Sequence, residues 1–126
     1  MAAGADIVAG QGPHVVQPAE LCYVNHPEVV PGIGTCSVQG EGEPRTAAVF
    51  YSLGDFGSEV ITVQAQVGIV GSVSLDSSGV TGMGWEGAAT ILGAETSIQP
   101  LETREEAVYV DERRRLGAHL GEEWKR

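Results

Sequence analysis

Two short apolar runs, each ending in a glycine-containing turn, most constrain what this chain can fold into. Residues 6–9 run into a turn at 10–14, and residues 47–52 run into a turn at 53–57. A short apolar run bounded by glycine is typical of a buried strand, and a turn at a strand end can present side chains from a rigid sheet. With 18 glycines in 126 residues, the composition favours a strand-rich domain over a helical bundle.

The segment between these two turns predicts little regular structure. Residues 15–16 and 21–24 are short extended candidates separated by a proline, which is disfavoured in the middle of a sheet. Residues 25–45 contain several prolines and glycines and few apolar residues, so they are predicted to form a long surface loop.

The second half of the chain predicts a hairpin and a terminal helix. Residues 64–75 alternate in polarity and indicate a half-buried strand, which a turn at 76–79 joins to a second strand over 80–85. Residues 90–92 add a further strand candidate. Over 111–124, apolar side chains at four-residue spacing predict one amphipathic helix.

The net charge argues against nucleic acid as a partner. Seventeen acidic and seven basic residues give a formal net charge of −10, which repels a phosphate backbone. The dense basic run at 113–115 is flanked by acidic residues, so we expect it to form the solvated face of the terminal helix. No stretch approaches the ~20 apolar residues that span a bilayer, and the chain does not open with a signal-peptide pattern.

Cys22 and Cys36 are the two cysteines of the chain. A disulfide between them would close one loop and could contribute ~3 kcal/mol in an oxidising compartment, and two free, partly buried thiols are the open alternative. Without a CxxC pair, two cysteines are weak support for zinc.

His14 is the candidate metal ligand, because a strand followed by a tight glycine turn can aim an imidazole at an ion. Spacing alone favours an ordinary surface histidine, stacked on Pro13 or bonded to the backbone. His26 and His119 have no partner at a ligand interval, and we expect both to be surface residues. Tyr51 and Ser52 have no identifiable base beside them, so core packing and a turn hydrogen bond are their expected roles.

Residues 3–21 and 49–56, in that order, resemble the CapA family of poly-γ-glutamate capsule synthesis proteins. Members of that family, which is related to calcineurin-like metallophosphoesterases, carry a Gly-His-x-Pro-His-Val loop followed by a Tyr-Ser-Leu-Gly-Asn-Phe strand end. The resemblance covers about residues 3–92. It implies an α/β fold, the C-terminal portion of a two-sheet sandwich, with residues 1–100 in a CapA-like domain and 101–126 as a helical extension.

The resemblance also implies a divalent metal site with His14 as a ligand. Near this residue the sequence departs from the family motifs. Gln11 stands where many members have histidine, and its neutral oxygen binds transition metals more weakly than imidazole does. Asp55 replaces the usual asparagine and could bond a turn amide or approach a cation. The family's earlier motifs, which supply most of the ligands, are absent, so we expect a catalytically incomplete chain.

Three functional hypotheses follow. The first is a CapA-like metallophosphoesterase-type portion that, if active, would be a metal-dependent hydrolase; for a full-length form the resemblance suggests the cell envelope. The second is a non-catalytic β-rich binding or assembly module whose strand edges pair with another chain, for example as a homo-oligomer. The third is an enzyme completed by a partner chain that supplies the missing motifs.

Overall fold

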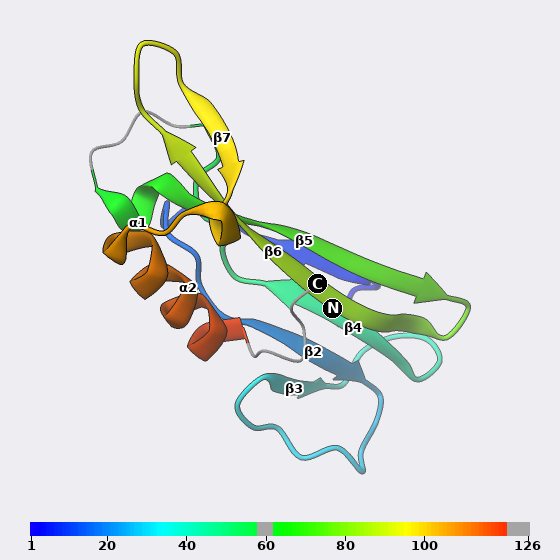
Figure 1. Ribbon diagram of the computed structural model, residues 1–126. Coiled ribbons are helices and arrows are strands. Elements are labelled where there is room, and N and C mark those ends of the chain that lie inside the picture. Colours follow the sequence, from blue (N-terminus) through cyan, green and yellow to red (C-terminus); the bar gives the residue numbers. More distant parts are fainter. Residues whose placement is uncertain (58–61, 121–126) are drawn as a thin grey trace.

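The structure, a computed structural model, describes residues 1–57 and 62–120 and is a mixed α/β fold composed mostly of strands (Figure 1). The mixed α/β class predicted from the sequence is confirmed. In chain order the elements are β1 (Ile7–Ala9), β2 (Ala19–Val24), β3 (Thr35–Val38), β4 (Arg45–Phe50), α1 (Val63–Gln66), β5 (Val67–Asp76), β6 (Gly79–Ile91), β7 (Ser97–Pro100), the 3-10 helix η1 (Leu101–Thr103) and α2 (Ala107–Leu120).

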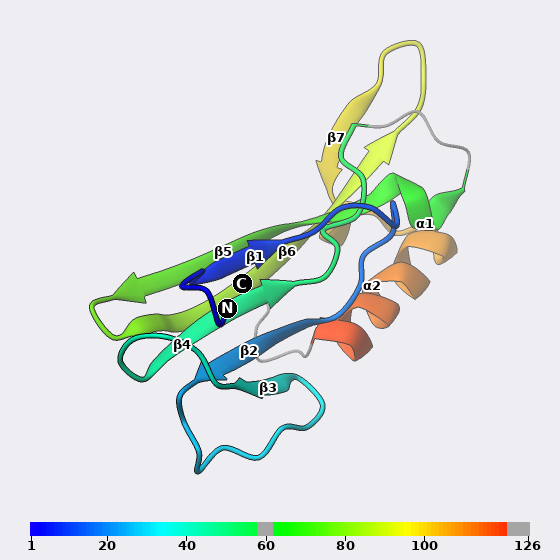
Figure 2. The ribbon, with the colours of Figure 1, turned by 180° about the vertical axis from the view of Figure 1, so that it is seen from behind.

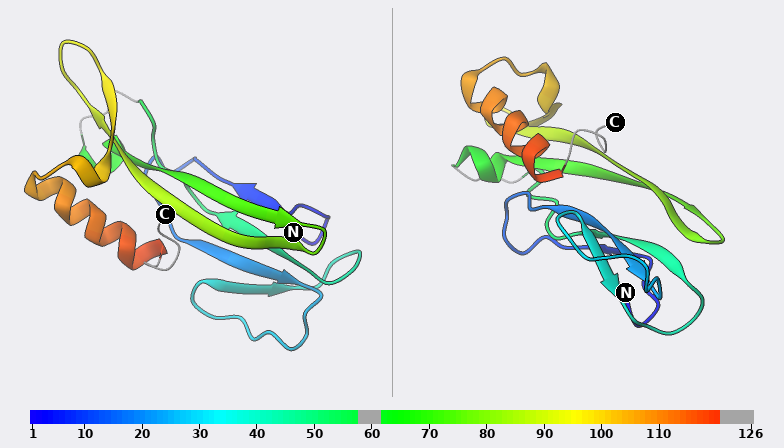
Figure 3. Two further views of the ribbon diagram at one scale, coloured as in Figure 1. Left: turned by 45° about the vertical axis from the view of Figure 1, so that its right-hand side comes forward. Right: turned by 90° about the horizontal axis from the view of Figure 1, so that it is seen from below.

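The described strands join in one seven-stranded sheet rather than in the two sheets expected from the family resemblance. Its order is β3-β2-β4-β6-β5, with β1 beside β4 and β7 beside β6. The register between β4 and β6 joins Thr46 to Gly79, so the two halves of the sheet meet over a short stretch. In the right-hand view of Figure 3, the β5–β6 hairpin (green) occupies the upper part of the picture, and β2 and β4 (blue to teal) occupy the lower part. The sheet therefore consists of two parts that join over a short stretch, with both helices near one end (Figure 1).

The predicted hairpin is confirmed, with β5 and β6 antiparallel from Val67 opposite Ala89 to Asp76 opposite Gly79. The Asp76 carboxylate closes its turn by accepting hydrogen bonds from the hydroxyl and the amide of Ser78, at 2.6 and 2.7 Å. These two bonds lower the pKa of Asp76, the hydroxyl having the larger effect. The residues predicted as a separate strand at 90–92 mainly continue β6, which ends at Ile91.

Residues 63–66 form a helical turn where the polarity pattern predicted the start of a strand. The amides of Ala65 and Gln66 both donate to the Thr62 carbonyl, each at 3.1 Å. Alanine and glutamine favour helix, so alternation over so few residues does not determine the conformation. At the other end of β5, Leu75 is 55% exposed although the pattern placed it on the buried face. Leu75 lies one residue before the end of β5 at the hairpin turn, where a register shift skips Thr81 of β6, so polarity alternation alone does not show that the strand has passed beyond the core.

The first apolar run forms β1, but the prediction that it is buried was wrong. Ile7 is 44% exposed and Val8 is 41% exposed. Within the described residues β1 pairs only with β4, in parallel, as Figure 2 shows from behind. An apolar sequence cannot reveal whether a second layer covers the strand, and none of the described elements buries this one.

The predicted surface loop at 25–45 contains a strand, which corrects that expectation. β3 pairs in parallel with β2, and Cys22 lies opposite Cys36 in the register. The two cysteines are joined by a disulfide, with their Cα atoms 4.4 Å apart. Thr35–Val38 is a short edge strand whose pairing depends on a partner outside the segment, so local composition favoured a loop.

The main core lies between the sheet and α2. It includes Phe50 of β4, Trp85 of β6 and Leu116 of α2, which are 4%, 3% and 0% exposed. The predicted terminal helix is present from Ala107 to Leu120, beginning earlier than expected because Tyr109 and Val110 donate amides to the Glu106 carbonyl. Trp124, part of the predicted pattern, lies outside the described residues.

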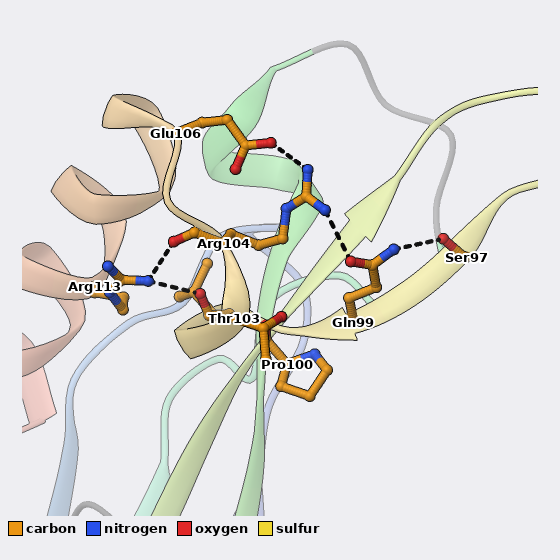
Figure 4. A network of polar contacts seen from close by, with 8 residues as sticks. Ser97, Gln99, Pro100, Thr103, Arg104, Glu106 and Arg113 are labelled. Carbon is orange, nitrogen blue, oxygen red and sulfur yellow. Dashed lines mark hydrogen bonds and ion pairs between the residues drawn. The ribbon is translucent and has the colours of Figure 1, made fainter.

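Arginines tie α2 to the segment before it, as Figure 4 shows. The Arg113 guanidinium donates to the carbonyls of Leu101 and Arg104, while the Arg104 guanidinium bonds Gln99 and Glu106. Of the basic run at 113–115, only Arg114 is exposed. The expectation that the whole run forms a solvated face was therefore wrong, because two of the three guanidinium groups bind backbone carbonyls inside the fold.

Candidate functional site

The turn that carries His14 is held against the end of β4 by backbone hydrogen bonds. The Gly10 amide donates to the Phe50 carbonyl at 2.8 Å, and the Leu53 amide donates to the Gly10 carbonyl at 3.0 Å. A Cβ on Gly10 would lie 2.4 Å from the Tyr51 carbonyl oxygen, so only glycine permits this approach. His14 itself has a φ of +61°, a conformation that few non-glycine residues adopt.

The turn after β4 is equally constrained. Gly54 has a φ of +74° and pairs with Gly68 through an isolated antiparallel bridge. Its amide donates to the buried Ser52 hydroxyl at 3.2 Å, the kind of turn hydrogen bond expected for Ser52. The Ile69 amide donates to the Leu53 carbonyl at 2.9 Å, which fastens the turn to β5. Residues 53–55 are thus held between the first turn and the start of the hairpin.

The two turns meet through their side chains. His14 Nδ1 lies 2.9 Å from Asp55 Oδ1, and the Gln11 amide nitrogen donates to the Gly54 carbonyl at 3.1 Å. These contacts join residues that are 41 and 43 positions apart in the sequence. All three residues singled out from the sequence as metal ligands or site neighbours therefore gather in one place.

Exposure differs sharply between the two members of this pair. The side chain of His14 is 70% exposed and that of Asp55 is 11% exposed. Asp55 Oδ2 is buried and has no hydrogen-bond partner among the described residues. A buried carboxylate oxygen without a partner is costly, so this oxygen is suited to a donor or a cation.

The donors present fit part of a metal site. An imidazole and a carboxylate are ordinary ligands of divalent transition metals, and the Gln11 carbonyl oxygen is a weaker one. Catalytic zinc sites typically use three protein ligands, and no group of three or more His, Cys, Asp or Glu suited to a metal occurs within residues 1–57 and 62–120. The described residues thus offer up to one strong nitrogen ligand and one carboxylate at this place.

A shallow apolar hollow lies beside the two turns. Its volume is about 300 Å³, and its lining includes Gln11, Gly54, Phe56 and Val70. Phe56 is 54% exposed and Val70 is 53% exposed. The surface next to the two turns is therefore largely hydrophobic, with Gln11 as the polar side chain of its lining.

Tyr51 differs from its expected role in core packing, because half of it is exposed. Its hydroxyl donates a hydrogen bond to the Glu20 carboxylate, which raises the pKa of Tyr51. Glu20 lies on β2, and the antiparallel register that brings β2 beside the end of β4 places the two side chains together. The sequence carried no signal for this pair, because strand pairing alone creates it.

Helix α2 supports the His14 turn from within the fold. The buried Glu112 carboxylate forms an ion pair with Arg115 at 2.8 Å, and the Arg115 guanidinium donates to the Val16 carbonyl at 3.3 Å. Val16 is 1% exposed and lies two residues after His14. The spacing of Glu112 and Arg115 is visible in the sequence, but their contact with a turn almost a hundred residues earlier is not.

The other predicted features are placed as follows. His26 bonds Glu28 at 2.8 Å, and His119 is exposed on α2. No described helix is long and apolar enough to cross a membrane.

In a comparison with known proteins, one family model matches the part of the chain that holds both turns. Residues 1–59 match the family model described as bacterial capsule synthesis protein PGA_cap. Neither curated proteins nor solved structures yielded a match to the chain. The matched segment includes Gln11, His14 and Asp55. The resemblance to the CapA family of capsule synthesis proteins is therefore confirmed over residues 1–59.

Proposed function

We propose that this chain is part of a CapA-like, capsule-associated domain in which His14 supplies one ligand to a divalent metal site. The observation that supports this best is the 2.9 Å contact between His14 Nδ1 and Asp55 Oδ1, which brings together two turns that each resemble a family motif. Both turns lie within the segment that matches the capsule synthesis family. The link to polyglutamate capsule metabolism rests on that family relationship alone.

The residues of the site have distinct roles in this proposal. The His14 imidazole, exposed to solvent, binds the cation, and the Asp55 carboxylate bonds the imidazole. Gln11 fastens its turn to Gly54 through its amide nitrogen, which leaves its carbonyl oxygen as a weak additional donor. A divalent cation in such a site supplies Lewis acidity and lowers the pKa of bound water, the chemistry of a metal-dependent phosphoesterase or hydrolase.

We further propose that the isolated chain is catalytically incomplete. One imidazole and one carboxylate fall short of the three protein ligands that catalytic zinc normally needs, and two-metal centres need more. Additional ligands would have to come from outside the described residues, on the same polypeptide or on a partner chain. Efficient turnover of a phosphodiester by this chain alone would contradict the proposal.

Replacing His14 with alanine is expected to weaken binding of Zn²⁺ or Mn²⁺ by at least about tenfold, since losing even a residue that orients a ligand commonly costs about 10–100-fold in affinity. Isothermal titration calorimetry of each metal into wild-type protein and variant measures this. His26→Ala is the matched control, because His26 also bonds a carboxylate, Glu28, at 2.8 Å but lies outside the two turns. Equal loss in both variants, or none in either, would refute the role of His14.

The exposed strand β1 favours a second candidate, a β-rich assembly module. Ile7 and Val8 are 44% and 41% exposed, and β1 has one strand neighbour among the described residues. An edge strand with exposed apolar side chains is suited to pairing with another chain. Size-exclusion chromatography with light scattering should then detect a concentration-dependent dimer that Val8→Lys disrupts. A monomer at every concentration would exclude this function for β1.

A further inference from the structure

The His14 and Asp55 pair joins a fixed carboxylate to an exposed imidazole. His14 projects from its turn with 70% of its side chain exposed, and the described contact that holds the ring is Nδ1 to Asp55 Oδ1 at 2.9 Å. The Asp55 side chain is 11% exposed. The described contact of the exposed ring is therefore with a largely buried carboxylate.

Asp55 is fixed by the backbone around it. A Cβ built on Gly68 would lie 2.3 Å from the Asp55 carbonyl oxygen, so β5 passes directly against this residue. Gly54, immediately before Asp55, is bridged to Gly68 and receives the Gln11 side-chain hydrogen bond on its carbonyl. The carboxylate is thus presented from a turn that the sheet holds on two sides.

We infer that Asp55 is a positioning residue that selects the tautomer of His14. An ionised carboxylate is only an acceptor, so the neutral imidazole must carry its proton on Nδ1 to make this hydrogen bond. The lone pair is then on Nε2, whose direction in the ring plane diverges from that of Nδ1, so it is not occupied by the contact with Asp55. Asp55 thereby leaves the lone pair of Nε2 available to a ligand. That this ligand is a divalent cation rests on the proposed function, whereas the choice of tautomer does not.

The inference is tested on the intact chain without metal. Long-range ¹H–¹⁵N spectra of uniformly ¹⁵N-labelled protein, recorded in alkaline solution where imidazoles are neutral, distinguish a protonated ring nitrogen from one with a lone pair. Wild-type His14 should show a protonated Nδ1 and an unprotonated Nε2. Asp55→Asn should shift His14 towards the other tautomer, because an asparagine amide can donate to Nδ1 as well as accept from it.

A matched control is present in the same molecule. Glu28→Gln removes the carboxylate that lies 2.8 Å from His26 Nδ1, so it should alter the ring signals of His26 and leave those of His14 unchanged. Backbone amide spectra report whether Asp55→Asn preserves the fold. If that variant alters strand signals throughout, Asp55→Glu, which retains the carboxylate, provides a second comparison and should keep the His14 proton on Nδ1.

The two proposals fail in different ways. A wild-type His14 whose proton resides mainly on Nε2, or a tautomer unchanged in a folded Asp55→Asn protein, would overturn the positioning role whatever the metal titration shows. Tautomer selection with no metal affinity at His14 would support the inference and refute the proposed function. If both hold, Asp55→Asn should weaken metal binding by about 10–100-fold, the range for residues that orient a ligating histidine, while Glu28→Gln has no effect.

Discussion

Replacing Gly54 with alanine is expected to lower the free energy of unfolding by about 2–5 kcal/mol. The residue has a φ of +74°, and an L-residue held in the left-handed region loses about 1–2 kcal/mol. The added Cβ would also lie 2.7 Å from the Val67 carbonyl oxygen and 2.9 Å from a methyl group of Val16. Crowding of this kind in a packed region costs about 1–3 kcal/mol.

Urea denaturation followed by circular dichroism measures the loss, and Gly12→Ala is its control. Gly12 lies in the neighbouring turn, where an added Cβ would meet no heavy atom within 4 Å. Its substitution should change stability by no more than about 0.5 kcal/mol. Equal stability of the two variants would show that the close contact of the 53–55 turn with β5 is not a constraint. Because Asp55 follows Gly54 directly, the Gly54 variant should also weaken the contact to His14.

Removing the disulfide between Cys22 and Cys36 is expected to cost about 3 kcal/mol, since the bond closes a loop over a sequence separation of 14. The double variant Cys22→Ala/Cys36→Ala should therefore unfold at lower urea concentration than the oxidised protein. β3 should respond most, because its described strand pairing is with β2 alone. Its amides should lose protection from hydrogen exchange while those of the β5–β6 hairpin keep theirs.

Reduction of the wild-type protein provides the control for this substitution. Dithiothreitol should lower its stability towards that of the double variant and should have no effect on the variant itself. Identical unfolding midpoints for oxidised and reduced wild-type protein would contradict a stabilising disulfide. A loss in the variant without a loss on reduction would instead assign the effect to packing at Cys22, which is 1% exposed.

Features determined by near neighbours were predictable from the sequence. The turn at Asp76–Gly79 was recognised because a carboxylate that accepts bonds two residues ahead and a glycine at positive φ are sufficient to reverse the chain. The terminal helix followed from the spacing of Leu116 and Leu120, since side chains four apart share one face. Both turns that contain site residues were located from glycines at the ends of apolar runs.

Features determined by pairing between distant segments were not predictable in this way. The exposure of Ile7 and Val8 depends on which element covers β1, and the pairing of β3 depends on β2. The hydrogen bond from Tyr51 to Glu20 exists because β2 runs antiparallel beside β4. Each of these outcomes depends on the register of a strand pair or on which element covers a strand. The local sequence of a single segment encodes neither of these.

His14 and Asp55 show both what the local sequence determines and what depends on pairing between distant segments. The sequence by itself determined that an imidazole and a carboxylate would each follow a glycine turn, because glycine alone adopts or tolerates the close backbone approaches at Gly10 and Gly54. Only the tertiary structure decided that Nδ1 of one lies 2.9 Å from Oδ1 of the other. That distance arises because β1 pairs with β4 and the start of β5 presses on the 53–55 turn, interactions that the chain makes only once the sheet has formed.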